Sequence, residues 1–426
     1  MDTNLVLSLV ILLLVVIGFV SGKFRLGLVG MAGAVLLNLT GVLTFDETFA
    51  YLSNGNIVMI AGMFIMSGAL SKTSIVSKMR DGLLKKAGKG STIVWIYLIA
   101  CMVLIQFILP TPLIGMMLPF MAVLDKDSDV KPSQILLPGT MVAFMMQGFA
   151  PFGIGTSFWG MFNGYLEAGG SDLTLGILDY AKVLFVPAVI ALIYLAVYGW
   201  KHYPAQEIDA EMLGGGKNQA ASLSKGQENL VYIVFVLVVL GMIFSSFIPF
   251  DINVLPAVGV IILMFLGIMD LNDVKNNINL DVCFMIVGIQ AVATALQKTG
   301  AGTVIADTLM KILGGNPSGI VVLIAFYFTG ALLTQFMSNI ATMNIFCPLA
   351  VITALSQGLD PRAFCLAIAA GCNAAMLTPN ASPSTAVAFG AGRYKLKDVL
   401  KVNLPLWIIY GAAVMFMANM LYPIGG

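Results

Sequence analysis

Apolar runs of about 20 residues recur along the whole chain, and this pattern limits what the chain can fold into. A helix of that length spans the hydrocarbon core of a bilayer. Hydrophobic residues make up 59% of the 426 residues and charged residues only 10%, whereas soluble domains carry about 25% charged residues. The sequence predicts an all-α polytopic membrane protein in the lipid bilayer, with clear crossings near 4–22, 26–44, 55–71, 178–200, 229–247, 253–269, 280–297 and 402–423.

Four further apolar stretches are interrupted. Gly and Pro break 132–166 and 362–392, and we interpret each as one crossing made of two half-helices. The stretches 91–124 and 318–357 are each split near the middle, and Leu113–Leu124 is too short to cross. We interpret both as re-entrant hairpins. The expected total is ten crossings and two hairpins.

The loop charges orient the chain. With the N-terminus outside, the inside loops hold eighteen Lys and Arg residues and the outside holds four, Lys182, Lys298, Lys311 and Arg362. This bias follows the positive-inside rule. No basic segment precedes the first apolar run, so we interpret that run as a retained span. The sequence predicts a multi-pass protein of the cell inner membrane with both termini outside.

The two halves of the chain resemble each other. Matching residues keep an offset that drifts only from 226 to 232: Ala69–Thr73 with Ala295–Thr299, Gln106-Phe107 with Gln335-Phe336, and Gly139 and Pro151 with Gly371 and Pro383. We divide the chain into a first repeat (1–202), a polar cytoplasmic linker (203–227) and a second repeat (228–426). Each repeat holds five crossings, one hairpin and one broken helix. Because five is odd, the second repeat must be inverted, as in many secondary transporters.

Polar residues gather at the two hairpin tips and the two broken helices. Irregular backbone at membrane depth is tolerated where it lines a cavity, where free N–H groups favour anions and free oxygens suit sodium. The alternative for a single Ser or Thr is a bond to its own helix. The candidate binding residues are Thr111, Gly153, Gly155, Thr156, Ser157, Ser338, Asn339, Thr342, Asn380, Ser382, Ser384 and Thr385, with sodium expected at Ser338, Asn339 and Ser382.

The sequence disfavours several other classes. The only histidine, His202, lies in a polar loop, and the five cysteines lie in apolar runs without a CxxC pair. No Asp or Glu lies deep in a span, which disfavours a buried-carboxylate proton pump and an intramembrane enzyme. We expect no nucleic-acid partner, because no basic stripe is present, and no cofactor besides a coupling sodium ion. Two hairpins that meet at one point disfavour a channel.

At the hairpins and broken helices the chain resembles the divalent anion:sodium symporter family of the ion transporter superfamily. The second tip, Ser338-Asn339-Ile340, is similar to the family's Ser-Asn-Thr, and Gly155-Thr156 and Ala388–Gly392 are similar to its broken-helix segments. The first tip keeps only Thr111 of its motif. The resemblance implies a homodimer in which hairpins and broken helices form a transport domain. That domain slides as an elevator against a scaffold of the remaining helices.

These features together predict a secondary transporter of a small anion, dicarboxylate-like or an inorganic oxyanion, coupled to sodium. Two alternatives keep the fold. The chain could be the membrane subunit of a binding-protein-dependent carboxylate system, or an anion uniporter or exporter. The sequence does not distinguish them.

Overall fold

In the computed structural model the described residues are 2–21, 23–74, 91–107, 109–110, 113–114, 117, 129–151, 154–206, 208, 223–243, 251–278, 280–312, 315, 317–336 and 338–424. This part of the chain is helical and contains no β-strand. The longer helices of the first half are α1 (Thr3–Ser21), α2 (Leu26–Leu39), α4 (Gly55–Ser71), α6 (Ser91–Leu104), α8 (Pro132–Met145), α9 (Ile154–Ala168) and α10 (Asp179–Ile193). The short elements are α3 (Phe45–Phe49), η1 (Ala50–Ser53), η2 (Tyr194–Gly199) and α11 (Trp200–His202).

The second half is helical as well. Its longer helices are α12 (Lys225–Ile243), α13 (Leu255–Phe265), α15 (Leu280–Lys298), α16 (Ala301–Ile312), α17 (Gly319–Leu333), α18 (Asn339–Ser356), α19 (Pro361–Asn373), α20 (Pro383–Ala391) and α21 (Leu396–Leu421). Its short elements are η5 (Ile252–Val254), α14 (Leu271–Asn277) and η6 (Pro379–Ala381). Helix α12 begins inside the range expected for the linker.

Helix length limits how many crossings the structure supports. Among the described residues, four helices are long and apolar enough to cross alone, and a bent pair of α3–η1 with α4 would be a fifth. Six other apolar helices have 10–17 residues. The expected broken crossings are observed as pairs of shorter helices, α8 with α9 and α19 with α20. Helix α18, expected as a hairpin arm, is itself long enough to span. The count of ten crossings stays a prediction.

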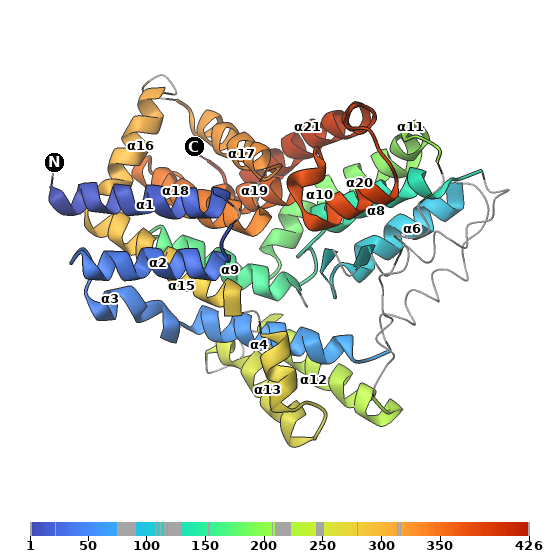
Figure 1. The fold of residues 1–426 in the computed structure, drawn as a ribbon, viewed down its shortest axis with the longest axis horizontal. Coiled ribbons are helices and arrows are strands. Elements are labelled where there is room, and N and C mark those ends of the chain that lie inside the picture. Colours follow the sequence, from blue (N-terminus) through green and yellow to red (C-terminus); the bar gives the residue numbers. More distant parts are fainter. Residues whose placement is uncertain are drawn as a thin grey trace.

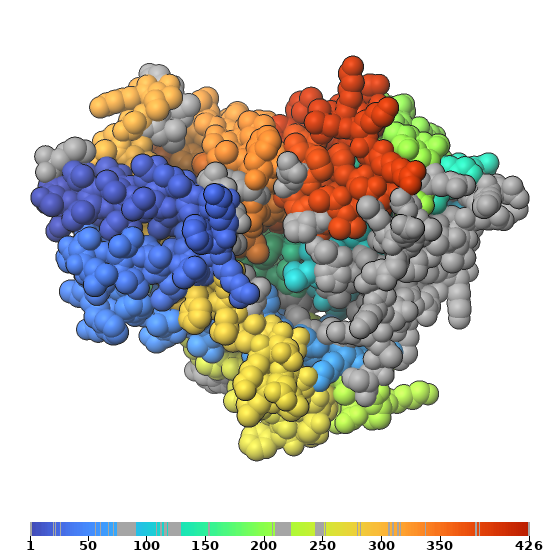
Figure 2. Space-filling model, in the orientation of Figure 1, coloured from blue at the N-terminus to red at the C-terminus, as the bar shows by residue number. Residues whose placement is uncertain are grey.

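The helices form two groups. Helices α1, α2 and α15 pack together, and α4 packs against α12 and α13. Helices α6, α8, α10 and α17–α21 form the other group, and α9 contacts both (Figure 1). On the face drawn in Figure 2, α1, α2 and α13 lie apart from the red C-terminal helices. Large apolar side chains are exposed on both groups, including Phe265 and Phe416, as expected of helices that face lipid.

Helices α2 and α15 approach each other closely at glycine residues. A Cβ added at Gly288 would lie 2.1 Å from the carbonyl carbon and 2.2 Å from the carbonyl oxygen of Gly30. A Cβ at Gly27 would lie 2.7 Å from the carbonyl oxygen of Asp281. Small residues let membrane helices approach to backbone contact. This crossing joins one helix from each half of the chain.

Two helix starts recur 226 residues apart. Thr44 caps α3, accepting from the N–H of Glu47, whose carboxylate accepts from the N–H of Thr44 at 2.8 Å. Asp270 caps α14 in the same way with Asp273. Each pair is a capping box. The turn before each box contains a glycine with positive φ, Gly41 at 74° and Gly267 at 66°, a conformation that side chains disfavour.

The acidic residues of the two capping boxes also form ion pairs between the two halves of the chain. Lys298 Nζ lies 2.7 Å from Glu47, and Lys72 pairs with Asp273 in the equivalent contact. Burial would raise the pKa of Asp273, but hydrogen bonds from Lys72 and from the backbone of Asp270 lower it overall. The four residues keep the offset of 226. These recurrences support a chain built from two repeats; the inversion of one repeat relative to the other stays a prediction.

Candidate functional site

The first break lies between α8, which ends at Met145, and α9, which begins at Ile154. A Cβ at Gly155 would lie 1.8 Å from the carbonyl oxygen of Ala150, so only glycine lets the chain return this closely. Thr156 and Ser157 are buried in the first turn of α9. Two expected residues, Gly153 here and Thr111 at the first hairpin tip, lie outside the described residues.

The second break lies between Asn373 and Pro383, with the short η6 inside it. Ser382 is the N-cap of α20: its Oγ accepts from the N–H of Thr385 at 3.0 Å and lies 2.8 Å from the Thr385 hydroxyl. Ser384 and Thr385 are buried. The backbone of Asn380 lies in η6, and its side chain is outside the described residues. Capping therefore occupies part of the hydrogen-bonding capacity of Ser382.

The segment expected as the second hairpin tip lies at the start of α18. Ser338 is its N-cap and is exposed, but its side chain makes no cap hydrogen bond. Thr342 is buried and its hydroxyl donates to the carbonyl oxygen of Ser338 at 3.0 Å, which is the local bond expected of a helical threonine. Half-buried Asn339 contacts Thr334, which is fully buried at the end of α17. The tip thus presents Ser338 and Asn339 as its two available polar side chains.

Side chains donate hydrogen bonds to several carbonyl oxygens at the breaks. A buried carbonyl oxygen without a hydrogen-bond partner destabilises the folded protein. At the first break Tyr410 donates to Met145 and Gln106 to Met146. At the second, the donors and carbonyls are Thr334 to Cys372, Gln335 to Ala374, Thr385 to Ala375 and Asn403 to Met376. Any cation at these carbonyls would use their second lone pair.

The two breaks lie in one region of the molecule. Helix α8 packs against α19 and α20, and α9 packs against α18 and α19 (Figure 1). The sequence has no Asp, Glu, Lys or Arg in 132–166, 318–359 or 363–392. Among the described residues no cluster of His, Cys, Asp or Glu could hold a metal ion. An anion in this region would be met by helix N-termini, hydroxyls and amides.

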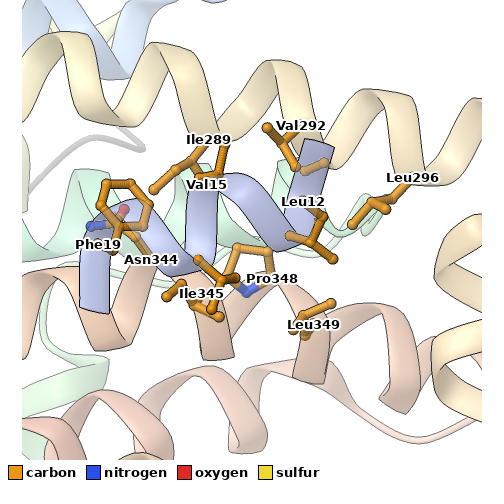
Figure 3. A pocket seen from close by; sticks show the side chains of 12 residues that line it. Leu12, Val15, Phe19, Ile289, Val292, Leu296, Asn344, Ile345, Pro348 and Leu349 are labelled. Atoms are coloured by element: carbon orange, nitrogen blue, oxygen red, sulfur yellow. The ribbon is translucent and has the colours of Figure 1, made fainter. Parts of the chain in front are cut away.

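Two cavities lie near this region. One of about 30 Å³ lies between α1, α15 and α18, where apolar side chains surround Asn344 (Figure 3). Asn344 Oδ1 has no hydrogen-bond partner among the described residues. A space of this size suits water and is too small for a carboxylate solute. The other, about 640 Å³, is lined by Trp159, Asn163 and the Asp179–Lys182 ion pair, and begins one helical turn from Thr156.

Three residues at the breaks were not expected as site residues. Gln106, Gln335 and Thr334 precede the hairpin tips and reach the broken helices. The two glutamines were recognised only as repeat markers. The available signal was a glutamine at the same place in both halves, in arms that are otherwise mostly apolar.

Interrupted helices with polar breaks, surrounded by helices that expose apolar side chains, are typical of multi-pass membrane transporters. The citrate transporter family matches residues 12–371 and, in a second match, 254–424. The chain belongs to this family, within the ion transporter superfamily, and the expected resemblance to the divalent anion:sodium symporters is confirmed. The family and its relatives are transporters and not enzymes.

Relatives differ in how much they share. The sodium-dependent dicarboxylate transporter SdcS of Staphylococcus saprophyticus is 24% identical over 88% of this chain and 77% of its own length. An uncharacterized transporter of Synechocystis is 28% identical, but over 47% of this chain and 32% of its length. Sodium/sulfate cotransporter 1 of Chlamydomonas reinhardtii is 27% identical over 35% of this chain and 17% of its length. The chain thus spans about a third of the Synechocystis relative.

Solved transporter structures share the fold. The YdaH transporter of Alcanivorax borkumensis has a TM-score of 0.56 at 14% identity, covering 91% of this chain and 87% of that one. MtrF of Neisseria gonorrhoeae, described as an antimetabolite efflux pump, has a TM-score of 0.57 at 12% identity, covering 100% and 97%. The all-α polytopic fold expected from the sequence is confirmed.

Proposed function

We propose that this protein is a sodium-coupled secondary transporter of a small anion, either a di- or tricarboxylate or an inorganic oxyanion. The anion binds where the two broken helices and the hairpin tips meet. The names of the dicarboxylate and sulfate transporters among its relatives support sodium and an anionic substrate. The proposal includes a homodimer in a cell inner membrane with both termini outside, which rests on the family resemblance and on the loop charges.

One observation carries the proposal: three helices begin at the uncharged, polar breaks and tip. These are α9, α18 and α20. Free N–H groups and the positive end of the helix dipole favour an anion at each start. Without a fixed Lys or Arg in these segments, a bound cation would supply the remaining positive charge. This is the arrangement expected for coupled binding of an anion and sodium.

Hydrogen-bond accounting at the second tip supports Asn339 as a sodium ligand. Thr334 Oγ1 lies 2.8 Å from Asn339 Oδ1 and 2.8 Å from the carbonyl oxygen of Cys372. A hydroxyl has one proton, so donation to Cys372 requires Asn339 to present its amide nitrogen to Thr334. If the amide is turned over from the orientation in which Oδ1 faces Thr334, the carbonyl oxygen points away from that hydroxyl. It becomes available to a cation at the tip.

The packing supports an elevator mechanism. The second hairpin and the second broken helix are linked through Thr334 and Gln335, whereas α2 and α15 form a separate close crossing. The former would be part of the moving transport domain and the latter part of the scaffold. The cavity of about 640 Å³ beside Trp159 would give solutes a route toward the α9 end of the site.

Thermal unfolding of the detergent-purified protein tests the substrate class. We expect one of citrate, succinate or sulfate to raise the unfolding temperature by several degrees in sodium chloride, and by much less in choline chloride. A ligand at 100 times its Kd stabilises the folded state by about 2.7 kcal/mol. Glucose and glycerol serve as neutral controls.

The pattern of stabilisation separates the alternatives. An anion that stabilises equally in both salts would contradict sodium coupling and favour a uniporter. No response to any anion would favour a membrane subunit that needs a soluble binding protein, and co-purification would then be examined.

A further inference from the structure

Two buried glutamines make the same set of hydrogen bonds in the two halves of the chain. Gln106 follows α6 and Gln335 follows α17, each three residues before a hairpin tip. Their exposed fractions are 4% and 1%. Each side chain reaches from its hairpin arm to the break of a broken helix about 40 residues further along the chain.

The amide nitrogen bridges two carbonyl oxygens in each case. Gln106 Nε2 donates to Met102 in its own arm at 2.8 Å and to Met146 at the first break at 3.0 Å. Gln335 Nε2 donates to the carbonyls of Ala331 at 2.8 Å and Ala374 at 3.0 Å. Because both amide hydrogens face carbonyls, the orientation of each amide is fixed: exchanging N and O would place oxygen against oxygen.

The amide oxygen accepts from a backbone N–H further along the same break. The N–H of Ala150 donates to Gln106 Oε1 at 3.0 Å, and the N–H of Leu377 donates to Gln335 Oε1 at 2.8 Å. The glutamine backbone adds a further contact, since Gln106 O accepts from the N–H of Ile154 at 3.3 Å. Each glutamine side chain therefore bonds to two backbone positions within one break, three or four residues apart.

The backbone of Gln335 also contacts the second break, and its neighbours lie at the candidate sodium site. Its carbonyl oxygen accepts from the Thr378 hydroxyl at 2.6 Å. Thr334, beside it, bonds to Cys372 and Asn339. Only an amide side chain of this length offers two donors and one acceptor without charge. Breaking these bonds in a dry interior would leave several backbone groups without partners.

We propose that Gln106 and Gln335 are positioning residues for transport. Each joins a hairpin to the break of its broken helix, so that tip and break move as one body and keep the binding geometry between them. The claim that tip and break move together during transport rests on the proposed function. The existence of the bridges can be measured without any substrate.

Hydrogen exchange of the purified protein tests the bridges directly. Replacing glutamine by methionine keeps the volume and removes the amide. In Gln335→Met we expect at least tenfold faster exchange in the peptide 374–382, with 146–154 unchanged, and the reverse in Gln106→Met. Gln290→Met is the matched control, because Gln290 is equally buried but lies on α15 and donates to Gly164 on α9. Exchange within twofold of wild type at both breaks would overturn the proposal.

Sodium binding tests the positioning role. The concentration of sodium that gives half of the maximal protection against thermal unfolding should rise at least tenfold in Gln335→Met. The protection at saturating sodium should approach that of wild type. A purely structural role would reduce the yield of folded protein and leave the half-saturating concentration unchanged. Faster exchange with an unchanged sodium response would therefore overturn the positioning role. If wild type shows no response to sodium, sodium coupling fails, and exchange still decides whether the bridges exist.

Gln335→Glu keeps the measurement interpretable if the methionine variant does not fold. A carboxyl group still accepts from the N–H of Leu377, but it has at most one proton to donate and so cannot donate to both Ala374 and Ala331. We expect exchange in 374–382 to be faster than in wild type. The increase should be smaller than in Gln335→Met, which removes both the donors and the acceptor. Wild-type exchange in a folded Gln335→Glu protein at pH 8 would contradict the role of the amide nitrogen.

Discussion

Replacing Asn339 with alanine is expected to raise the sodium concentration that gives half-maximal stabilisation at least tenfold, which corresponds to a loss of about 1.4 kcal/mol in binding free energy. Asn339 begins α18 and contacts the buried Thr334 hydroxyl, which fixes the amide at the second tip. Its loss removes the side-chain oxygen that we expect to bind the cation. Thermal unfolding against sodium concentration, with choline to keep ionic strength constant, measures the effect.

Two comparisons test whether the effect belongs to this site. Asn344→Ala changes the same residue type on the same helix, but in the small apolar cavity, and should keep the sodium response. Thr111→Ala should have a smaller effect than Asn339→Ala, because the first tip retains less of its motif. An unchanged sodium response in Asn339→Ala would remove the second tip from the site.

Gly288→Ala is expected to lower the free energy of unfolding by about 1–3 kcal/mol or more, the usual cost of overpacking. The new methyl group would meet the backbone of Gly30, at 2.1 Å from its carbonyl carbon. A backbone cannot rotate away as a side chain can, so α2 and α15 must separate. The expected result is a lower unfolding temperature and less folded protein after purification.

Gly226→Ala is the matched control for this change. Gly226 lies in the first turn of α12, and a Cβ there would have no heavy atom within 4 Å. Alanine is a better helix former than glycine, so this variant should be neutral or up to about 1 kcal/mol more stable. Equal unfolding temperatures for both variants would show that the α2–α15 crossing is looser than the structure indicates.

The sequence predicted the positions of most elements because hydropathy and helix breakers act locally. The first three apolar runs correspond to α1, α2 and α4, and the interrupted stretches correspond to α8 with α9 and α19 with α20. Helix α13 is shorter than its run, 253–269, because the helix ends near Gly267, where φ is positive. The candidate residues Ser338 and Asn339, expected at a hairpin tip, lie at the start of α18; their role in binding stays a prediction.

Roles of individual side chains were harder to predict. Ser382 was expected to bind sodium, and the structure shows its hydroxyl capping α20 with Thr385. Thr342, expected in the site, bonds within its own helix. Whether these hydroxyls also contact a solute stays a prediction. A Ser or Thr pattern cannot distinguish a cap from a ligand, because both need the same oxygen.

The sequence by itself determined the class of protein, the location of the helix breaks and the correspondence of the two halves, because each follows from residues close together or from a constant offset. Only the tertiary structure decided which distant groups meet. In the structure Lys72 forms an ion pair with Asp273, the backbones of Gly30 and Gly288 lie against each other, and Gln335 donates a hydrogen bond to Ala374. These contacts join segments about 40 to 260 residues apart, and side-chain identity alone does not specify which partner a buried amide or lysine will reach.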